Sequence, residues 1–146
     1  MGRRSETGGA EVVVPEVAGP ETPKLMVDVV IPSEKGVVLV RRGSEPYEGQ
    51  WALPGGFVEV GETVREAAVR EAAEETGLAV EVSRLVGVYS DPDRDPRGHN
   101  VSVVFLVRVL SGQMKAASDA AEVDVLDPAG VELAFDHRRI IDDAMS

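Results

Sequence analysis

The sequence predicts a mixed α/β domain built around one main helix, and two observations lead to that prediction. Short Val-rich runs bounded by Gly and Pro recur along the chain, which is typical of β-strands. One longer segment, residues 63–76, combines helix-forming residues with a start and a stop signal. A chain of 146 residues has the length of one ordinary domain that can bury its own core.

The N-terminal region, residues 1–22, is rich in Gly, Glu, Pro and Thr. This composition predicts a flexible tail that precedes a single folded domain over residues 23–146. An apolar patch at Val12, Val13 and Val14 could add a short edge strand.

The first half of the domain alternates strands with turns. Residues 25–31 and 37–40 read as strands separated by a turn at 32–36, and a hairpin is the simplest arrangement. After a loop at 43–50 and a short extended piece at 51–53, residues 54–56 (Pro-Gly-Gly) predict a tight turn. Its glycines would let the backbone come close to another group.

The main helix is predicted from its two ends. Thr63 is a candidate N-cap with Glu66 three residues on, which is the capping-box arrangement. Gly77 is a natural residue to follow the last helical turn.

The second half of the domain is again rich in strands. The predicted elements are one strand or two at 78–89, a polar loop at 90–100, an apolar strand at 101–110 that is buried on both faces, a loop at 113–121, a short strand at 123–126 and a C-terminal helix at 137–144.

Charge and composition exclude several classes of protein. Twenty-six acidic against fifteen basic residues give a net charge of −11, which disfavours a nucleic-acid partner held by its phosphates. No apolar run reaches about 18 residues, so no membrane span is predicted. The first twenty residues lack the apolar core of a signal peptide, and the chain has no cysteine for disulfides. We therefore expect a cytoplasmic protein.

Three carboxylates share one stripe of the main helix. Glu71, Glu74 and Glu75 fall within an arc of about 100°, where they repel one another. A solvated acidic face is the ordinary interpretation of such a run. Here, however, the run follows the Pro-Gly-Gly turn, which can aim backbone carbonyls at the same point. Oxygen ligands of this kind suit Mg²⁺ or Mn²⁺. Zn²⁺ is disfavoured because the chain has no Cys, and its two His residues lie far apart.

At this point the segment resembles the Nudix box, G-x5-E-x7-R-E-U-x-E-E-x-G-U, in which U is a bulky aliphatic residue. The matching residues are Gly56, Glu62, Arg70, Glu71, Glu74, Glu75, Gly77 and Leu78. Ala72 departs mildly, because it places a small side chain at the first U position.

The resemblance implies an α/β/α sandwich around a mixed β-sheet, with the box forming a loop–helix–loop. It also implies that the Gly56 carbonyl, Glu71, Glu74 and Glu75 form the metal shell, while Arg70 and Glu62 orient these ligands. Two candidates remain open for the general base. One is Glu71 itself, and the other is Glu122, in a loop outside the box, which is as well explained as an ordinary surface acid.

Substrate choice must come from outside the box. The Pro-punctuated loop at 90–99 resembles one in Nudix ADP-ribose pyrophosphatases, with Pro92 at the position of a marker proline, and residues 133–137 also resemble that group. Candidate substrate-binding residues in or near this loop and the strand ends are Asp91, Pro92, Arg97, His99, Arg41 and Arg42. Candidate aromatic partners for an adenine ring are Tyr47, Trp51 and Phe57, although a lone Trp beside a strand more often packs in the core. His137 is interpreted as structural.

Three functions follow, in falling order. The first is Mg²⁺-dependent hydrolysis of ADP-ribose, a small nucleotide, to AMP and ribose 5-phosphate. The second is hydrolysis of a nucleoside triphosphate of the 8-oxo-dGTP type. The third is a nucleotide sensor without catalysis, which the intact box carboxylates disfavour. By analogy with the ADP-ribose group, we expect a homodimer.

Overall fold

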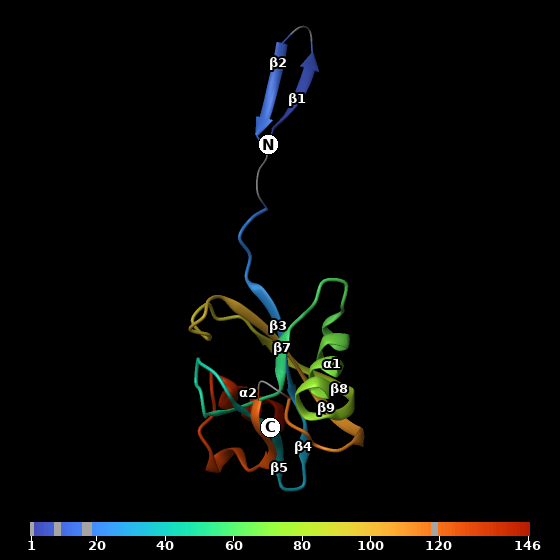
Figure 1. Cartoon of the computed structure of the whole chain (residues 1–146), viewed down its shortest axis with the longest axis vertical. Coiled ribbons are helices and arrows are strands. Elements are labelled where there is room, and N and C mark those ends of the chain that lie inside the picture. The colour runs from blue at the N-terminus through green and yellow to red at the C-terminus, as the bar shows by residue number, and fades with distance from the viewer. Residues whose placement is uncertain (1, 8–9, 16–18, 118–119) are drawn as a thin grey trace.

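A computed structural model describes residues 2–7, 10–15, 19–117 and 120–146 and contains strands, two α-helices and one 3₁₀ turn (Figure 1). The elements are β1 (Gly2–Thr7), β2 (Ala10–Pro15), β3 (Lys24–Val30), β4 (Pro32–Ser33), β5 (Gly36–Arg42), β6 (Trp51–Ala52), β7 (Gly55–Phe57), α1 (Val64–Thr76), β8 (Leu78–Tyr89), β9 (Asn100–Gly112), β10 (Ala120–Leu126), η1 (Pro128–Gly130) and α2 (His137–Met145). The predicted mixed α/β class is confirmed.

Two β-sheets form the centre of the domain. One has the strand order β7-β3-β9-β8, in which β3 runs parallel to β9 and antiparallel to β7, so the sheet is mixed as predicted. The other has the order β10-β5-β4, and β6 also pairs with β5.

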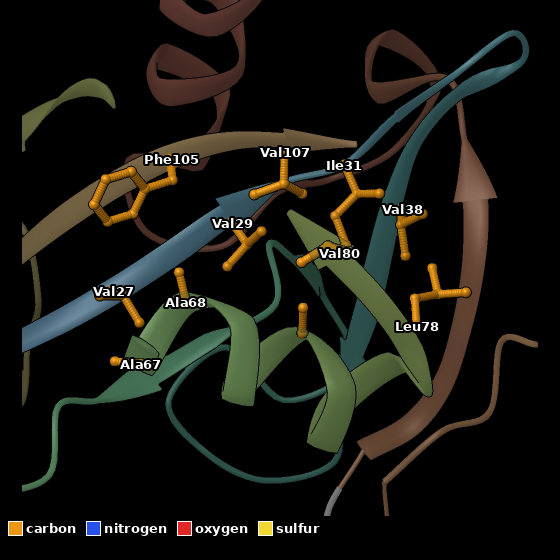
Figure 2. Close-up of a cluster of buried hydrophobic side chains, with 11 residues drawn as sticks. Val27, Val29, Ile31, Val38, Ala67, Ala68, Leu78, Val80, Phe105 and Val107 are labelled. Atoms are coloured by element: carbon orange, nitrogen blue, oxygen red, sulfur yellow. The ribbon is translucent and has the colours of Figure 1, made fainter. Parts of the chain in front are cut away.

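Alternating side chains on β3 and β9 create the sandwich. Val27 and Val29 on β3 join Phe105 on β9 in a core cluster with the buried alanines of α1, as Figure 2 shows. Val30 and Val104 lie in a second cluster with Ile140 and Ile141 of α2. Successive strand residues point to opposite faces, so each helix covers its own face of the mixed sheet. Full burial of one Val side chain stabilises the fold by about 1.5–3 kcal/mol.

Both ends of α1 are capped as the sequence predicts. Glu66 N–H donates to Thr63 Oγ1 at 3.1 Å, and Thr63 N–H donates to the Glu66 carboxylate at 2.9 Å. Gly77 ends the helix in the left-handed conformation, with a φ of 79°, which costs glycine little.

The predicted Pro-Gly-Gly turn was partly wrong, because Gly55 and Gly56 lie in β7 and pair with β3. The close approach that the glycines were expected to permit is confirmed. A Cβ on Gly55 would lie 2.4 Å from Asp28 Oδ1, and one on Gly56 would lie 2.5 Å from Glu71 Oε1. The two glycines therefore let β7 fit between β3 and α1.

Other differences concern pairing and strand ends. The predicted hairpin is confirmed only at its tip, where β4 pairs with β5, because β3 pairs with β7 and β9. Burial on both faces of β9 ends at Val107, and Val109 and Leu110 are exposed. Residues 78–89 form the single strand β8, and β10 begins at Ala120, before the predicted start at 123. Residues 118–119 of the loop predicted at 113–121 lie outside the described residues.

The N-terminal β1 and β2 form a two-stranded antiparallel sheet of their own (Figure 1). Val12, Val13 and Val14 thus lie in a strand, and its partner is β1. Residues 1, 8–9 and 16–18 of the predicted tail lie outside the described residues. Among the residues that are described, no helix has the length and apolarity needed to cross a membrane.

Candidate active site

A cavity of about 250 Å³ opens between β3, β5, β7, α1 and the segment that leads into α2. Six of its lining residues were predicted as site residues: Arg41, Arg42, Gly56, Phe57, Glu75 and Arg97. Three buried polar residues that were not predicted as site residues also line the cavity: Asp28, Asp95 and His137. The cavity approaches the size range of small-ligand sites.

Arg70 holds the acidic cluster of α1 together. Its Nε donates to Glu62 at 2.6 Å, and its Nη1 donates to Glu71 at 2.8 Å and to Glu74 at 3.1 Å. The hydrogen bond from Arg70 lowers the pKa of Glu62 to about 2, and the same bond helps to raise the pKa of Arg70. The box arginine therefore holds Glu62, Glu71 and Glu74 in place.

Glu71 is the buried member of the cluster, and its carboxylate lies directly against Gly56. Burial raises the pKa of Glu71, although the hydrogen bond from Arg70 opposes that shift. Any side chain at position 56 would occupy the space of this carboxylate. The glycine of the box is thus required by packing.

The donor set fits a hard divalent cation, because carboxylate and carbonyl oxygens are the ligands that Mg²⁺ prefers. Gly56 and Glu75 line the cavity, and Glu71 touches Gly56. Within the described ranges, no three acidic or His side chains are gathered closely enough to hold a metal ion by themselves. Arg70 instead lies between Glu62, Glu71 and Glu74, so binding would require these carboxylates to turn toward the ion.

Two arginines at the end of β5 line the cavity. Arg41 donates to the Gly49 carbonyl at 3.0 Å and pairs with Glu122 at 3.1 Å, while Arg42 donates to the Pro46 carbonyl at 2.6 Å. Glu122 lies on β10 opposite Arg41 in the strand register, and its side chain is 49% exposed. The structure places Glu122 beside the cavity, held by a cation.

Only part of the predicted 90–99 loop reaches the cavity. Asp91 and Pro92 are exposed and do not line it. Arg97 lines the cavity and pairs with the buried Asp95 at 2.7 Å. Burial raises the pKa of Asp95, but the hydrogen bonds that Asp95 accepts, mainly from Arg97, outweigh burial and lower the pKa to about 2. The His99 ring hydrogen-bonds the Ser90 carbonyl at 3.0 Å, so it braces the loop. With Phe57 and Arg97, His99 also lines a neighbouring cavity of about 520 Å³.

The aromatic candidates separate into lining and packing residues. Phe57 lines both cavities, whereas Trp51 packs against the core cluster beneath α2. Tyr47 lies edge to face with Phe135, with 4.8 Å between the ring centroids. Phe135 itself lines the cavity, with the guanidinium carbons of Arg42 and Arg97 at 5.1 and 5.3 Å from its centroid.

The sequence analysis did not single out Phe135 as a site residue. Phe135 and Tyr47 both adopt positive φ, at 54° and 59°. Non-glycine residues in this conformation are uncommon and cluster at functional sites. No sequence pattern signals that conformation.

A buried polar group beneath the cavity was also missed. Asp28 accepts a hydrogen bond from Ser102 at 2.5 Å, and Arg94 forms a two-point ion pair with Asp136 at 2.7 and 2.9 Å. In the sequence, Asp28 could have been noticed as a single acidic residue within the Val-rich run of β3. His137 was interpreted as structural, and its Nδ1 does accept a hydrogen bond from Leu53 N–H at 3.0 Å, but it lines the cavity as well.

Comparison with known proteins agrees with this geometry. The family profile described as NUDIX domain matches residues 22–144. An ADP-ribose pyrophosphatase of Methanocaldococcus jannaschii is 52% identical over 124 residues, which cover 84% of this chain and 73% of that protein. A putative 8-oxo-dGTP diphosphatase of Bacillus subtilis is 38% identical over 88 residues, which cover 60% of this chain and 54% of that protein.

A solved structure shows the same fold. The NUDIX domain of Shewanella oneidensis NrtR, determined in complex with ADP ribose, matches with a TM-score of 0.75 and 26% identity, covering 86% of this chain and 88% of that one. Together with the box on α1 and the mixed sheet, these matches show that the chain belongs to the Nudix family. Within that family, the protein is a pyrophosphohydrolase.

Proposed function

We propose that this protein hydrolyses the pyrophosphate bond of ADP-ribose in a Mg²⁺-dependent reaction and releases AMP and ribose 5-phosphate. The observation that carries the proposal is the placement of Glu75 and Gly56 on one side of a cavity that Arg41, Arg42 and Arg97 also line. This arrangement offers acidic ligands for a metal and cations for a diphosphate. The 52% identity to a protein named ADP-ribose pyrophosphatase supports the choice of substrate.

In this proposal the Gly56 carbonyl, Glu71, Glu74 and Glu75 hold Mg²⁺, for which Mn²⁺ can substitute. When bound, such an ion neutralises phosphate oxygens and lowers the pKa of a coordinated water. Arg70 and Glu62 orient the ligands through the hydrogen bonds given above. Arg41, Arg42 and Arg97 bind the phosphates, and Arg97 can do so bidentately once it leaves Asp95.

Removal of the water proton falls to Glu71 or Glu122. Burial raises the pKa of Glu71, which is the direction of shift that a general base requires. Glu122 reaches the cavity edge through its pair with Arg41. Glu122→Gln separates the two candidates, because Glu71 is also a proposed metal ligand and its loss lowers kcat in either case. A large fall in kcat of a folded Glu122→Gln variant would favour Glu122 as the base, and near wild-type kcat would favour Glu71.

A nucleoside triphosphate such as 8-oxo-dGTP is the second candidate substrate. The likeness to a putative 8-oxo-dGTP diphosphatase favours it, although that match covers only 60% of this chain. The ADP-ribose proposal ranks first because its relative matches 84% of the chain at higher identity.

A hydrolysis screen with Mg²⁺ separates these candidates. It compares kcat/KM for ADP-ribose, NADH, a diadenosine polyphosphate, dGTP and 8-oxo-dGTP. We expect ADP-ribose to be preferred by at least about tenfold, or 1.4 kcal/mol in transition-state binding. A preference for a triphosphate would replace the first candidate by the second, and turnover of nothing would favour a sensor.

We further propose a cytoplasmic homodimer whose folded unit is residues 23–146, preceded by a tail. The lack of cysteine supports the compartment, and the family match, which begins at residue 22, supports the domain boundary. The dimer is proposed by analogy with the ADP-ribose pyrophosphatases of the family. Light scattering of the purified chain tests the dimer, and proteolysis of the native protein tests the boundary.

A further inference from the structure

Two buried polar side chains face each other across a gap in the wall of the cavity. Asp28 and His137 are 5% and 4% exposed, and both line the cavity. Asp28 Oδ1 lies 3.7 Å from His137 Nε2. That distance is too long for a direct hydrogen bond.

Each of the two groups has a defined hydrogen-bonding role. Leu53 N–H donates to His137 Nδ1 at 3.0 Å, so Nδ1 carries no hydrogen and the neutral ring carries it on Nε2. The ring is neutral at pH 7 because burial lowers the pKa of His137 to about 3. Ser102 occupies Asp28 Oδ2 at 2.5 Å, which leaves Oδ1 on the side of His137. Burial raises the pKa of Asp28 to about 7, so above that pH Oδ1 accepts and a donor and an acceptor are presented side by side.

A hydroxyl group fits this pair better than the other parts of a nucleotide do. A hydroxyl accepts and donates at one oxygen, and bonds of about 2.9 and 2.7 Å are long enough to span the gap from a single atom. An ionised phosphate oxygen has no hydrogen to donate, and a base would have to meet the pair with two different atoms, whereas a hydroxyl satisfies both groups with one oxygen. We propose that Asp28 and His137 bind one hydroxyl group of the substrate's sugar and thereby contribute to specificity.

Both groups are held rigidly, as a specificity site requires. Asp28 lies on β3 between β7 and β9, and its Oδ1 packs so closely on Gly55 that a Cβ at that position would lie 2.4 Å from it. His137 begins α2, and the preceding Asp136 is tied to Arg94 by the two-point ion pair. A buried donor and acceptor left without a partner are costly, so a ligand without the hydroxyl would be rejected.

The inference rests on the proposed function, because ADP-ribose supplies two riboses. The test measures kcat/KM of the wild type and of Asp28→Asn for ADP-ribose and for analogues that each lack one ribose hydroxyl. We expect one analogue to be at least about tenfold poorer than ADP-ribose with the wild type. With Asp28→Asn, the ratio of kcat/KM for ADP-ribose to kcat/KM for that analogue should fall toward one. The amide oxygen of Asn keeps the hydrogen bond from Ser102, so the amide nitrogen, a donor, faces His137 Nε2.

Asp143→Asn is the matched control, since it makes the same change in a carboxylate that accepts from Tyr89 and does not line the cavity. It should keep the wild-type ratio.

Equal ratios in the wild type and in a folded Asp28→Asn variant would overturn the inference. If Asp28→Asn does not fold, the kcat/KM values of the wild type for the analogues decide. Equal losses of kcat/KM for every missing hydroxyl would then overturn the inference. Failure of the wild type to hydrolyse ADP-ribose at all would overturn the proposed function as well, so the two failures are distinguishable.

Discussion

Of the three carboxylates that we assign to the metal, Glu75 is the one that lines the cavity. Glu71 and Glu74 are fixed by Arg70, and Glu71 is also packed against Gly56. At the scale of single residues, the proposed hydrolysis therefore depends on Glu75 as a ligand and on Arg70 as an orienting group. The proposed choice of substrate depends on the buried pair Asp28 and His137.

Replacing Glu75 by Gln should reduce kcat/KM at least about 100-fold, because it removes a charged ligand of similar volume. Thermal unfolding should be close to that of the wild type. Glu81→Gln, in an exposed carboxylate of β8 that pairs with Arg108, is the control and should remain active. Near wild-type activity of a folded Glu75→Gln variant would show that the metal ligands lie elsewhere.

The pKa shifts of Asp28 and His137 predict that the free energy of unfolding depends on pH with opposite signs. Burial lowers the pKa of His137 from 6.5 to about 3, so unfolding takes up a proton in that range and stability is lost as the pH falls. Burial raises the pKa of Asp28 from 3.8 to about 7, so unfolding releases a proton there and stability is lost as the pH rises. Between pH 3.8 and 6.5 the two contributions oppose each other.

Single substitutions should therefore uncover opposite slopes within that window. With Asp28→Asn the free energy of unfolding should decrease as the pH falls, and with His137→Gln it should decrease as the pH rises. Each slope is at most about 1.4 kcal/mol per pH unit, the value for one proton. Denaturant titrations at several pH values give the slopes, and parallel slopes for the two variants would contradict the assignment.

At the scale of elements, the local features were predictable and the pairing was not. The caps of α1 depend on residues within one helical turn, and the sequence analysis identified both Thr63 and Gly77. The strand at Gly55 and Gly56 was missed because it exists through pairing with β3, which lies far away in the sequence. The same pairing brings Asp28 to the cavity, so the buried polar pair could not be predicted either.

Gly56→Ala tests how β7 fits against α1. The new methyl group would meet the Glu71 carboxylate at 2.5 Å, and overpacking of this kind costs about 1–3 kcal/mol. We expect both lower stability and lower kcat, because Glu71 is displaced. Gly130→Ala, with nothing within 4 Å of the added atom, should change neither. Unaltered activity of Gly56→Ala would show that the position of Glu71 does not matter.

Arg97 is the residue of the 90–99 loop on which substrate choice should depend. Arg94 and Asp95 also line the first cavity, but their side chains are buried in ion pairs, whereas Arg97 is more exposed and lines both cavities. Arg97→Gln should change the ratio of kcat/KM between ADP-ribose and 8-oxo-dGTP by about tenfold. A change of that size corresponds to the loss of one strong hydrogen bond to the substrate. The Mg²⁺ concentration for half-maximal rate should stay unchanged. Arg139→Gln, in an exposed arginine of α2, is the control, and an unaltered ratio in Arg97→Gln would refute the assignment.

At the scale of the whole molecule, the Nudix box led to the correct fold class, because its spacing defines a loop–helix–loop next to a mixed sheet. The partition of the strands into two sheets was not predictable from runs of Val, which look alike whichever partner they pair with. The cavity arises between these sheets and the start of α2. For that reason the box residues were found from the sequence, while Asp28, Phe135 and the cavity role of His137 required the structure.

The most direct test of the central claim is product analysis of ADP-ribose hydrolysis by the purified wild type, with Mg²⁺ and with the ion removed by a chelator. We expect AMP and ribose 5-phosphate in equal amounts with Mg²⁺, and no release after chelation until Mg²⁺ or Mn²⁺ is restored. Products other than this pair, or release that continues without a divalent ion, would contradict the claim.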